Sequence, residues 1–169
     1  MKTLIMSDSH GWTEAVKRVA DRHRAEVDLI LHCGDSELAA DHEALDGIVT
    51  VKGNCDLGDE FPEETVEEVN NSVFFAGHGH LLNVKMTDQT LLYKGEEAGA
   101  DVVCYGHTHF PAAAEKNGIL LINPGSLRQP RGYPVGSYAV VELTEKQKTV
   151  TFFDLDGNEL ADLSGHFSK

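Results

Sequence analysis

Short apolar segments that each end in a polar loop are the feature that most constrains the fold of this chain. Residues 2–6, 27–32 and 48–51 have the length and apolar character of buried strands. Helix-like segments separate them, at residues 12–24 and 37–45. This alternation is typical of βαβ units, in which right-handed crossovers join parallel strands. We therefore expect an α/β fold with a parallel sheet in the first part of the chain.

The rest of the chain adds antiparallel pairs and one more helix. We expect a hairpin over residues 65–76 and a helix over residues 87–98. The remaining prediction is a strand at 101–105, a hairpin around 116–118, a loop over 123–134, strands at 137–143 and 149–155, and a polar tail over the last dozen residues. Thr13 is the expected cap of the helix at 12–24. No repeat or linker divides the chain, so we interpret residues 1–169 as a single domain.

The chain is strongly acidic. It has 14 Lys and Arg against 28 Asp and Glu, and a formal net charge of −14. A field of this sign repels nucleic acid backbones and anionic membranes, so we expect no general nucleic-acid binding and no membrane association. A small phosphoester substrate would need local positive charge, which bound divalent cations can supply. A homo-oligomer is left open.

The cysteines and the N-terminus bear on the cellular compartment. Cys33, Cys55 and Cys104 are an odd number with no C-x-x-C pair, so neither a disulfide framework nor a zinc ribbon is indicated. The apolar run before Asp8 is too short for a secretory signal, and no run reaches the length of a membrane span. We expect a soluble protein of the reducing cytoplasm.

Potential metal ligands occupy the loops that follow five of the strand-like segments. They are Asp8 and His10, then Asp35, Asn54, His78, and finally His107 and His109. Loops at the carboxyl ends of parallel strands meet at one edge of a sheet, so ligands far apart in the chain can converge there. Carboxylate, imidazole and amide ligands together suit Mn, Fe, Zn, Ni or Co, whereas Ca and Mg prefer shells made of oxygen.

The last two histidines lie in the segment CYGHTHFP, residues 104–111. Side chains alternate along an extended chain, so His107 and His109 can point the same way from the end of a strand. Alone the pair is a weak signal, because H-x-H also occurs on ordinary surface strands. The other four loops favour the metal-ligand interpretation.

This ordered set resembles the calcineurin-like metallophosphoesterase superfamily, whose pattern is D-x-H, G-D, G-N, an H-G element and G-H-x-H. The resemblance covers residues 8–109. The short chain, GNCD at 53–56, GHGH at 77–80 and NPGS at 123–126 are most similar to the small YfcE-type phosphodiesterase group. The implied fold is an α/β sandwich in α/β/β/α order, with two mixed β-sheets packed together and flanked by helices.

The resemblance also implies the metal ligands. Asp8, His10 and His109 would hold one divalent ion and Asn54, His78 and His107 a second, with Asp35 bridging both. Manganese is favoured, and Ni, Fe, Zn or Co are alternatives. Two ions about 3.5 to 4 Å apart can activate a bridging hydroxide for in-line attack on phosphorus.

The implied activity is that of a dinuclear metal-dependent phosphodiesterase, with a phosphomonoesterase as the alternative. A Vps29-like protein-binding scaffold is less favoured. Such scaffolds tend to have degraded metal motifs, whereas every ligand position here carries a competent residue.

One position departs from the better known members of the superfamily. Many phosphatases carry His directly after the motif Asn, whereas this chain has Cys55, a weaker proton donor. A proton for the leaving group would then come from His10, His80 or water. The catalytic candidates are therefore His10, His80 and Asn54.

The segment NPGSLRQPRGYP, residues 123–134, is the expected substrate-contacting loop. Asn123, Gly125 and Ser126, together with Cys55, are the substrate-binding candidates. Exposed backbone amides near Gly125 and an arginine could meet phosphate oxygens, and the alternative is a rigid Pro/Gly loop with solvated arginines. For residues 123–126 we favour the positioning of backbone near the metals.

Several other residues are less directly interpretable. Arg128 and Arg131 either meet a phosphate or are solvated, and Asp56 either orients a ligand or caps a loop. We interpret the remaining histidines as surface or packed residues: His23, His32, His42 and His166.

Overall fold

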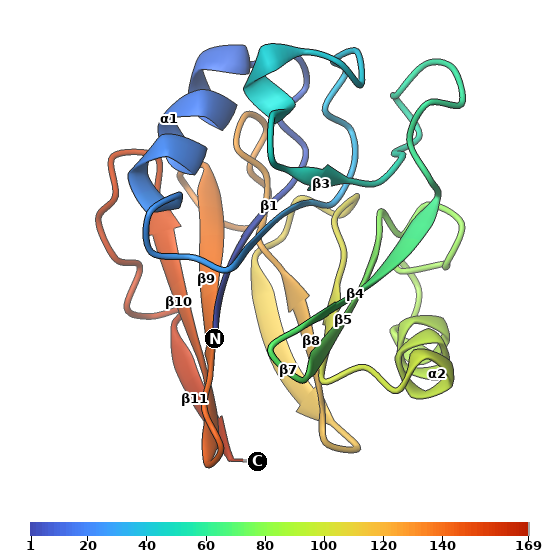
Figure 1. Cartoon of the computed structure of the whole chain (residues 1–169), viewed down its shortest axis with the longest axis vertical. Helices are drawn as coiled ribbons and strands as arrows, with labels where there is room; N and C mark the ends of the chain where they lie inside the picture. The colour runs from blue at the N-terminus through green and yellow to red at the C-terminus, as the bar shows by residue number, and fades with distance from the viewer. Residues whose placement is uncertain (169) are drawn as a thin grey trace.

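Two β-sheets lie face to face in the computed structural model of the protein, which describes residues 1–168 (Figure 1). The strand orders are β11-β10-β9-β1-β2-β3 and β4-β5-β6-β8-β7. The first sheet contains β1 (Lys2–Met6), β2 (Leu29–His32), β3 (Val49–Thr50), β9 (Ser137–Leu143), β10 (Gln147–Asp154) and β11 (Gly165–Ser168). The second contains β4 (Glu64–Val69), β5 (Ser72–Gly77), β6 (Val102–Cys104), β7 (Ala112–Lys116) and β8 (Ile119–Asn123).

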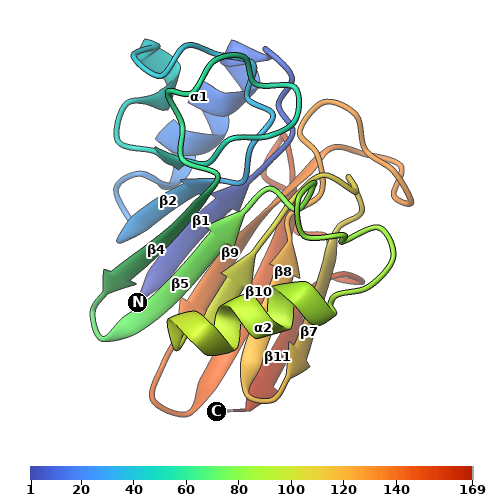
Figure 2. The same cartoon turned by 90° about the vertical axis from the view of Figure 1, so that its right-hand side faces the viewer.

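One helix covers the outer face of each sheet. Helix α1 (Thr13–His23) packs on the first sheet and α2 (Gln89–Ala98) on the second, so the layers run helix, sheet, sheet, helix (Figures 1 and 2). Parallel and antiparallel pairs occur in both sheets. The α/β/β/α sandwich expected from the sequence is confirmed.

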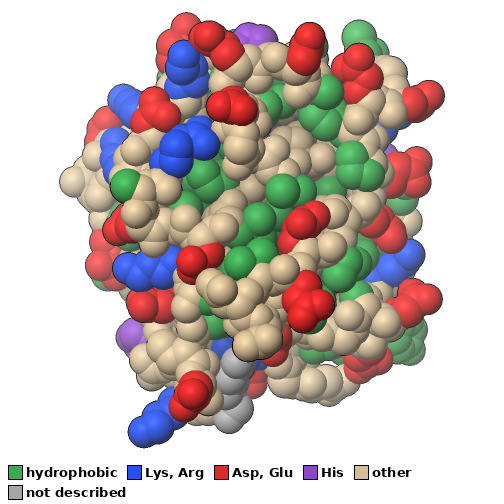
Figure 3. All heavy atoms as spheres, viewed as in Figure 1, with side chains coloured by type: hydrophobic (Ala, Val, Ile, Leu, Met, Phe, Trp, Pro, Cys, Tyr) green, Lys and Arg blue, Asp and Glu red, His purple; other side chains and the backbone are tan. Residues whose placement is uncertain are grey.

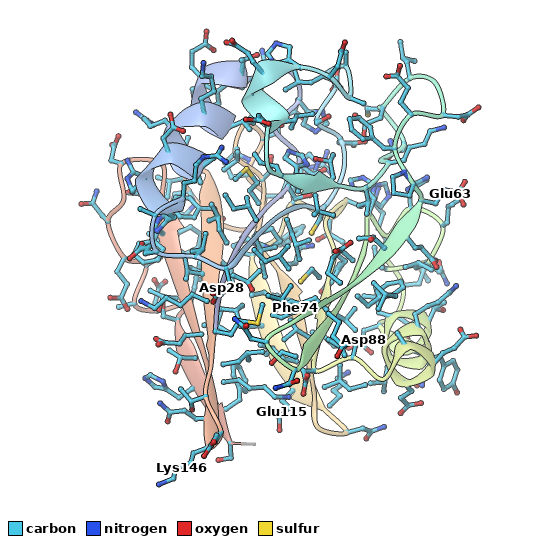
Figure 4. All side chains as sticks on the ribbon, in the orientation of Figure 1. Asp28, Glu63, Phe74, Asp88, Glu115 and Lys146 are labelled. Carbon is cyan, nitrogen blue, oxygen red and sulfur yellow. The ribbon has the colours of Figure 1, made fainter. Side chains whose placement is uncertain are left out.

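The strands are apolar on both faces because each sheet is covered on both sides. In β1, Leu4 and Met6 face α1, whereas Ile5 faces the second sheet. Phe74, labelled in Figure 4, is fully buried between the two sheets. These continuous apolar runs therefore hold the sheets together and leave the loops at the strand ends free for polar residues.

Two helix predictions were wrong. Helix α1 begins at Thr13 itself, with Trp12 at the N-cap position and no side-chain capping bond, so Thr13 is not the cap. The helix expected over residues 37–45 is reduced to the short 3-10 turn η1 (Glu43–Leu45). Glu37 has a left-handed φ of 54°, and its amide donates to Asp56 (2.7 Å), which holds the start of this segment as a loop.

The last dozen residues, of which all but Lys169 are described, do not form a polar tail. Strand β11 pairs with β10 along the edge of the first sheet. Leu160, Leu163 and Phe167 pack against the buried cluster between the sheets. Burying these three apolar side chains offsets the loss of chain entropy, so the segment is ordered.

Strand direction determines where the polar loops lie. Strands β1, β2 and β3 are parallel, as are β5, β6 and β8. The loops that follow them gather at the upper end of the sandwich in Figures 1 and 2. Acidic side chains are spread over the face shown in Figure 3, in keeping with the net charge of −14. Within residues 1–168, no helix has the length and apolar composition needed to cross a membrane.

Candidate metal centre

The loops that follow β1, β2, β3, β5 and β6 meet at one end of the sheets. Backbone hydrogen bonds join them, from Asp8 N to Gly34 O (3.0 Å) and from Gly106 N to His78 O (3.0 Å). Glycine permits the closest approach at Gly53, where an added Cβ would lie 2.0 Å from Asp35 Oδ1. All seven expected ligands lie on these loops.

The backbone of the ligand loops is strained. Five of the seven expected ligands have φ between 44° and 67°: Asp8, His10, Asp35, His107 and His109. This left-handed region costs a residue with a Cβ about 1 to 2 kcal/mol, and such strain concentrates at functional sites. It also corrects one expectation. His107 and His109 do not alternate along an extended strand, because β6 ends at Cys104 and both histidines lie in the following loop.

Three histidines are oriented by hydrogen bonds from Nδ1. His78 Nδ1 donates to Cys33 O (2.6 Å), His109 Nδ1 to Gln129 O (2.7 Å), and His10 Nδ1 to a Glu37 carboxylate oxygen (2.5 Å). Because these oxygens can only accept, each Nδ1 carries a proton, and Nε2 is left to face the site, where it can bind a metal once it is deprotonated. Metal-binding histidines in proteins are held in this way.

Asp8 lies where these three Nε2 atoms converge, and it is fully buried. Its Oδ2 accepts hydrogen bonds from Ser7 Oγ (2.6 Å) and His107 N (3.1 Å). Its Oδ1 has no well-formed hydrogen bond, although Nε2 of His109, His10 and His78 lie 3.0, 3.9 and 3.9 Å from it. A buried oxygen without a hydrogen-bond partner is costly, so this atom needs a ligand that attracts it.

Asp35 lies between two groups of donor atoms. On one side, donor atoms of Asp8, His10 and His109 lie within 4.8 Å of one another. On the other, His78 Nε2 is 3.3 Å from Asp35 Oδ2 and 3.2 Å from Asn54 Oδ1. Donor atoms of Asp8, Asp35 and His78 also lie within 4.8 Å of one another, so Asp35 connects the two groups.

His107 lies at the border of the second group. Its ring centroid is 5.1 Å from that of His78, and the side chain is half-buried. Burial and the neighbouring His78 lower its pKa to about 4, so the ring is neutral at physiological pH and its nitrogen lone pair is available.

The donor set fits divalent ions. Imidazole, carboxylate and amide donors suit borderline metals, and Oδ1 of Asp8 faces imidazole nitrogens that a cation would attract. Without a cation, protons on His78 and His109 separate these atoms, in keeping with the raised pKa of both. The residues of the site therefore form a candidate cation-binding centre.

Charge coupling at the site favours ionised carboxylates. Burial opposes the charge on Asp8 and Asp35, but contacts with His109 and His78 outweigh it and lower the pKa of both. The contact with Asp8 raises the pKa of His109. Burial also opposes the charge on His78, but Asp35 and Asp8 raise its pKa. A metal ion would therefore compete with protons for these two histidines.

His80 and Cys55 lie beside the ligands. His80 Nδ1 is buried without a hydrogen-bond partner, and its ring centroid is 5.4 Å from that of His78. The Cys55 thiol lies within 4.8 Å of donor atoms of His10 and Asp35. Burial and the charge of Asp35 raise the pKa of Cys55 to about 11, so in the protein alone the thiol stays protonated.

Asn123, Gly125 and Ser126 make contacts that fit the expected positioning of backbone near the metals. Asn123 Nδ2 donates to Gly106 O (2.9 Å), and Gly125 N donates to Asn123 Oδ1 (2.9 Å). Ser126 Oγ donates to Asp8 O (2.7 Å). All three residues are buried and these polar groups are already bonded, so they position the ligand loops, and their contact with a substrate stays a prediction. Cys55 remains exposed beside the site.

Two further buried residues hold the ligand loops: Asp56, for which the sequence left two roles open, and His32, one of the histidines expected at the surface or packed. Asp56 accepts hydrogen bonds from the amides of Asp35 (2.8 Å), Gly53 (2.7 Å) and Glu37 (2.7 Å). The available signal was its place in GNCD, two residues after Asn54. Burial lowers the pKa of His32 to about 4, so its ring is neutral. Its Nδ1 accepts a hydrogen bond from Gly34 N (3.2 Å). The ring proton is therefore on Nε2, which contacts Ser9 Oγ (2.9 Å).

Comparisons with known proteins agree with the motifs. A family model, the calcineurin-like phosphoesterase superfamily domain, matches residues 1–146. The chain is 46% identical over 163 residues to the probable metallophosphoesterase YsnB of Bacillus subtilis, covering 96% of each protein. It is 26% identical over 171 residues to the phosphodiesterase YfcE of Escherichia coli, covering 84% of this chain and 88% of that protein.

Solved structures share the fold. The crystal structure of a predicted phosphoesterase from Streptococcus pneumoniae has a TM-score of 0.96 and 39% identity, covering 99% of this chain and 97% of that one. Zinc-bound Vps29 of Entamoeba histolytica has a TM-score of 0.74 at 20% identity, covering 99% of each chain. The likeness to Vps29 at this identity shows the fold alone.

Proposed function

Because this chain belongs to the calcineurin-like phosphoesterase superfamily, we propose that it is a dinuclear metal-dependent phosphodiesterase. The observation that carries the proposal is the convergence of three imidazole Nε2 atoms on the unpaired Asp8 Oδ1. Once deprotonated, these Nε2 atoms and the carboxylate oxygen all offer electron pairs, and such a set suits a divalent cation.

Two ions fit the arrangement better than one. Asp8, His10 and His109 form one donor group, and Asn54, His78 and His107 the other, with Asp35 between them. Seven ligands exceed the three that a mononuclear catalytic zinc site usually takes from protein. Manganese is the ion we propose, with Ni, Fe, Zn or Co as alternatives.

When bound, two divalent ions supply positive charge for the phosphoryl oxygens and a water acidified for in-line attack. The protein itself fixes where these donors point. Glu37, Cys33 O and Gln129 O hold His10, His78 and His109 in one tautomer, so the site needs no rearrangement before it binds a substrate.

The proton for the leaving group is assigned to His80 or to water. Both ring nitrogens of His10 are engaged, since Nδ1 donates to Glu37 and Nε2 faces Asp8. Cys55 is too weak an acid, with a pKa of about 11. His80 has an unpartnered Nδ1 and lies beside His78. This arrangement favours esters with good leaving groups.

A diester is the proposed substrate because YfcE, a relative over most of this chain, is named a phosphodiesterase. The reaction of a monoester, the alternative, requires the site to bind a second negative charge on the same phosphoryl group. The Vps29-like scaffold role is disfavoured because every expected ligand position of this chain carries a residue able to bind a metal.

We also propose a cytoplasmic location. It is supported by the three cysteines, which are free, with Cys33 and Cys104 buried as thiols in the cluster between the sheets.

Metal reconstitution tests the proposed function. The protein is stripped of metal and assayed after separate addition of Mn, Ni, Zn or Mg, with bis(p-nitrophenyl) phosphate as the diester and p-nitrophenyl phosphate as the monoester. We expect activity on the diester that depends on added metal, and two ions per chain by elemental analysis.

The double variant Asn54→Ala, His109→Ala removes one ligand from each group and should abolish both metal binding and activity. His166→Ala is the matched control, because His166 is exposed and contacts Thr149 in the β10–β11 pair. Diester hydrolysis that survives both chelation and the double substitution would refute the proposal.

A further inference from the structure

A second cleft adjoins the candidate metal centre and has no part in the chemistry described above. It has a volume of about 320 Å³ and is lined by Val84, Lys85, Thr108, Phe110 and Arg131. Thr108 lies between His107 and His109 in the chain, so the cleft is one peptide unit from a candidate ligand of each metal. A volume of this size accommodates a small organic group.

Two cations line this cleft without a partner. Within residues 1–168, neither the Lys85 ammonium nor the Arg131 guanidinium makes an ion pair or a side-chain hydrogen bond, and both side chains are exposed. Both line the cleft together with Thr108, which lies between the candidate ligands His107 and His109. In a chain with a net charge of −14, two uncommitted cations at one cleft attract an anionic group.

Phe110 provides an aromatic surface in the same cleft. Its ring rests against Gly132, where an added Cβ would lie 2.2 Å from the ring atoms Cδ1 and Cε1. Gly132 has a φ of 69°, a conformation that glycine adopts without strain. The ring is nevertheless 51% exposed. An aromatic ring that is supported on one side and open on the other can stack with a planar group.

The cleft beside Cys55 has the opposite charge. Its volume is about 360 Å³, and Glu37 and Glu60 line it together with Leu38 and Leu57. These carboxylates repel an anion. An anionic part of a substrate therefore favours the cleft of Lys85 and Arg131.

We propose that the Phe110 cleft binds the non-reacting part of the substrate, and that this part combines a planar ring with a second negatively charged group. The ring stacks on Phe110 and the anion pairs with Lys85 and Arg131. This inference rests on the proposed phosphoesterase function, because the reacting phosphoryl group must occupy the neighbouring metal centre. A nucleotide carrying a second phosphate has all three elements and serves as the probe.

Three competitive inhibitors separate the contributions. Ribose 5-phosphate, AMP and adenosine 3′,5′-bisphosphate are titrated against hydrolysis of bis(p-nitrophenyl) phosphate by the metal-loaded protein. The second compound adds a base to the first, and the third adds a phosphate to the second. We expect each addition to lower the inhibition constant about fivefold or more, through stacking and through a charge-assisted hydrogen bond.

Variants assign each gain to a residue. Phe110→Ala should abolish the preference for AMP over ribose 5-phosphate, and the pair Lys85→Gln, Arg131→Gln should abolish the preference for the bisphosphate over AMP. Ratios of inhibition constants cancel any change in affinity for the shared phosphate. Lys146→Gln is the control, because Lys146 lies at the lower end of the molecule in Figure 4, away from the loops.

The outcomes separate this inference from the proposed function. If the protein hydrolyses the diester but binds the three inhibitors equally, or if the variants keep both preferences, the cleft assignment is wrong and the phosphodiesterase proposal stands. If no metal supports hydrolysis, the phosphodiesterase proposal fails. In that case, calorimetric titration of the metal-loaded protein with the same three compounds tests whether the cleft binds the ring and the second anion. Equal affinities for the three compounds would overturn this assignment.

Discussion

The carboxylate of Asp56 joins the two loops that carry Asp35 and Asn54, so its replacement tests how the candidate site is held together. Oδ2 accepts from the amides of Asp35 (2.8 Å) and Gly53 (2.7 Å). Oδ1 accepts from Glu37 N (2.7 Å) and Ser36 Oγ (3.3 Å). The side chain is 6% exposed, so water cannot replace these bonds.

In Asp56→Asn, one oxygen becomes an amino group. At the Oδ2 end the amino group would face two amides, whereas at the Oδ1 end it would face only Glu37 N, because the Ser36 hydroxyl can accept a hydrogen bond. We therefore expect the amino group at the Oδ1 end. Hydrogen bonds to a charged group contribute about 1.5 to 3 kcal/mol each, so we expect a loss of about 2 to 3 kcal/mol in the free energy of unfolding. For a chain of this size that corresponds to a fall in melting temperature of about 5 to 10 °C. Metal affinity should also fall, by about 10- to 100-fold, because both loops are released.

Thermal unfolding and metal titration of the variant measure the two effects. Asp154→Asn is the matched control. Its carboxylate also accepts several hydrogen bonds, from Asp156 N, Asn158 N and Asn158 Nδ2, but in an exposed turn that carries none of the candidate ligands. We expect the control to retain metal binding. This account of the loops would be refuted if the free energy of unfolding of Asp56→Asn lay within about 1 kcal/mol of that of the parent and its metal affinity were unchanged.

Three further predictions follow from the site. Activity at limiting metal should fall as the pH drops through the raised pKa values of His78 and His109, because a protonated imidazole cannot bind metal. Excess metal should shift this loss of activity to lower pH, and a loss at the same pH whatever the metal concentration would contradict the reasoning. His107→Ala and His109→Ala should each leave about one ion per chain by elemental analysis, since the two rings lie in different donor groups, and loss of the same ion in both would count against two sites. Cys55→His should increase the rate on esters with poor leaving groups more than on activated aryl esters; equal effects on both would show that this position does not assist the leaving group.

The strand pattern was predictable because it depends on local composition. The runs of β1 and β2 are mostly apolar, as strands covered on both sides require, and the polar loops that follow mark where each strand ends. The family resemblance extended this to the sandwich as a whole. The predicted helix at residues 37–45 failed because Glu37 is held by Asp56, a contact that no local pattern reveals.

The last strand was hidden for a similar reason. Residues 158–168 look polar in sequence, but Leu160, Leu163 and Phe167 reach a cluster built by other segments. Their burial depends on the edge of the first sheet, which forms only when β9 and β10 are in place. Contacts between distant segments decided this part of the fold.

The sequence by itself determined the identity of the candidate ligands and their order along the chain, because residue types set coordination chemistry and strand ends set the loops. Only the tertiary structure decided how those ligands are held. The left-handed backbone at His107 and His109, the tautomer of His78 and the bonds of Asp56 all arise from contacts between loops that are far apart in sequence. The same packing placed Lys85, Phe110 and Arg131 around one cleft, because it brings the loops after β5, β6 and β8 together beside the candidate metal centre.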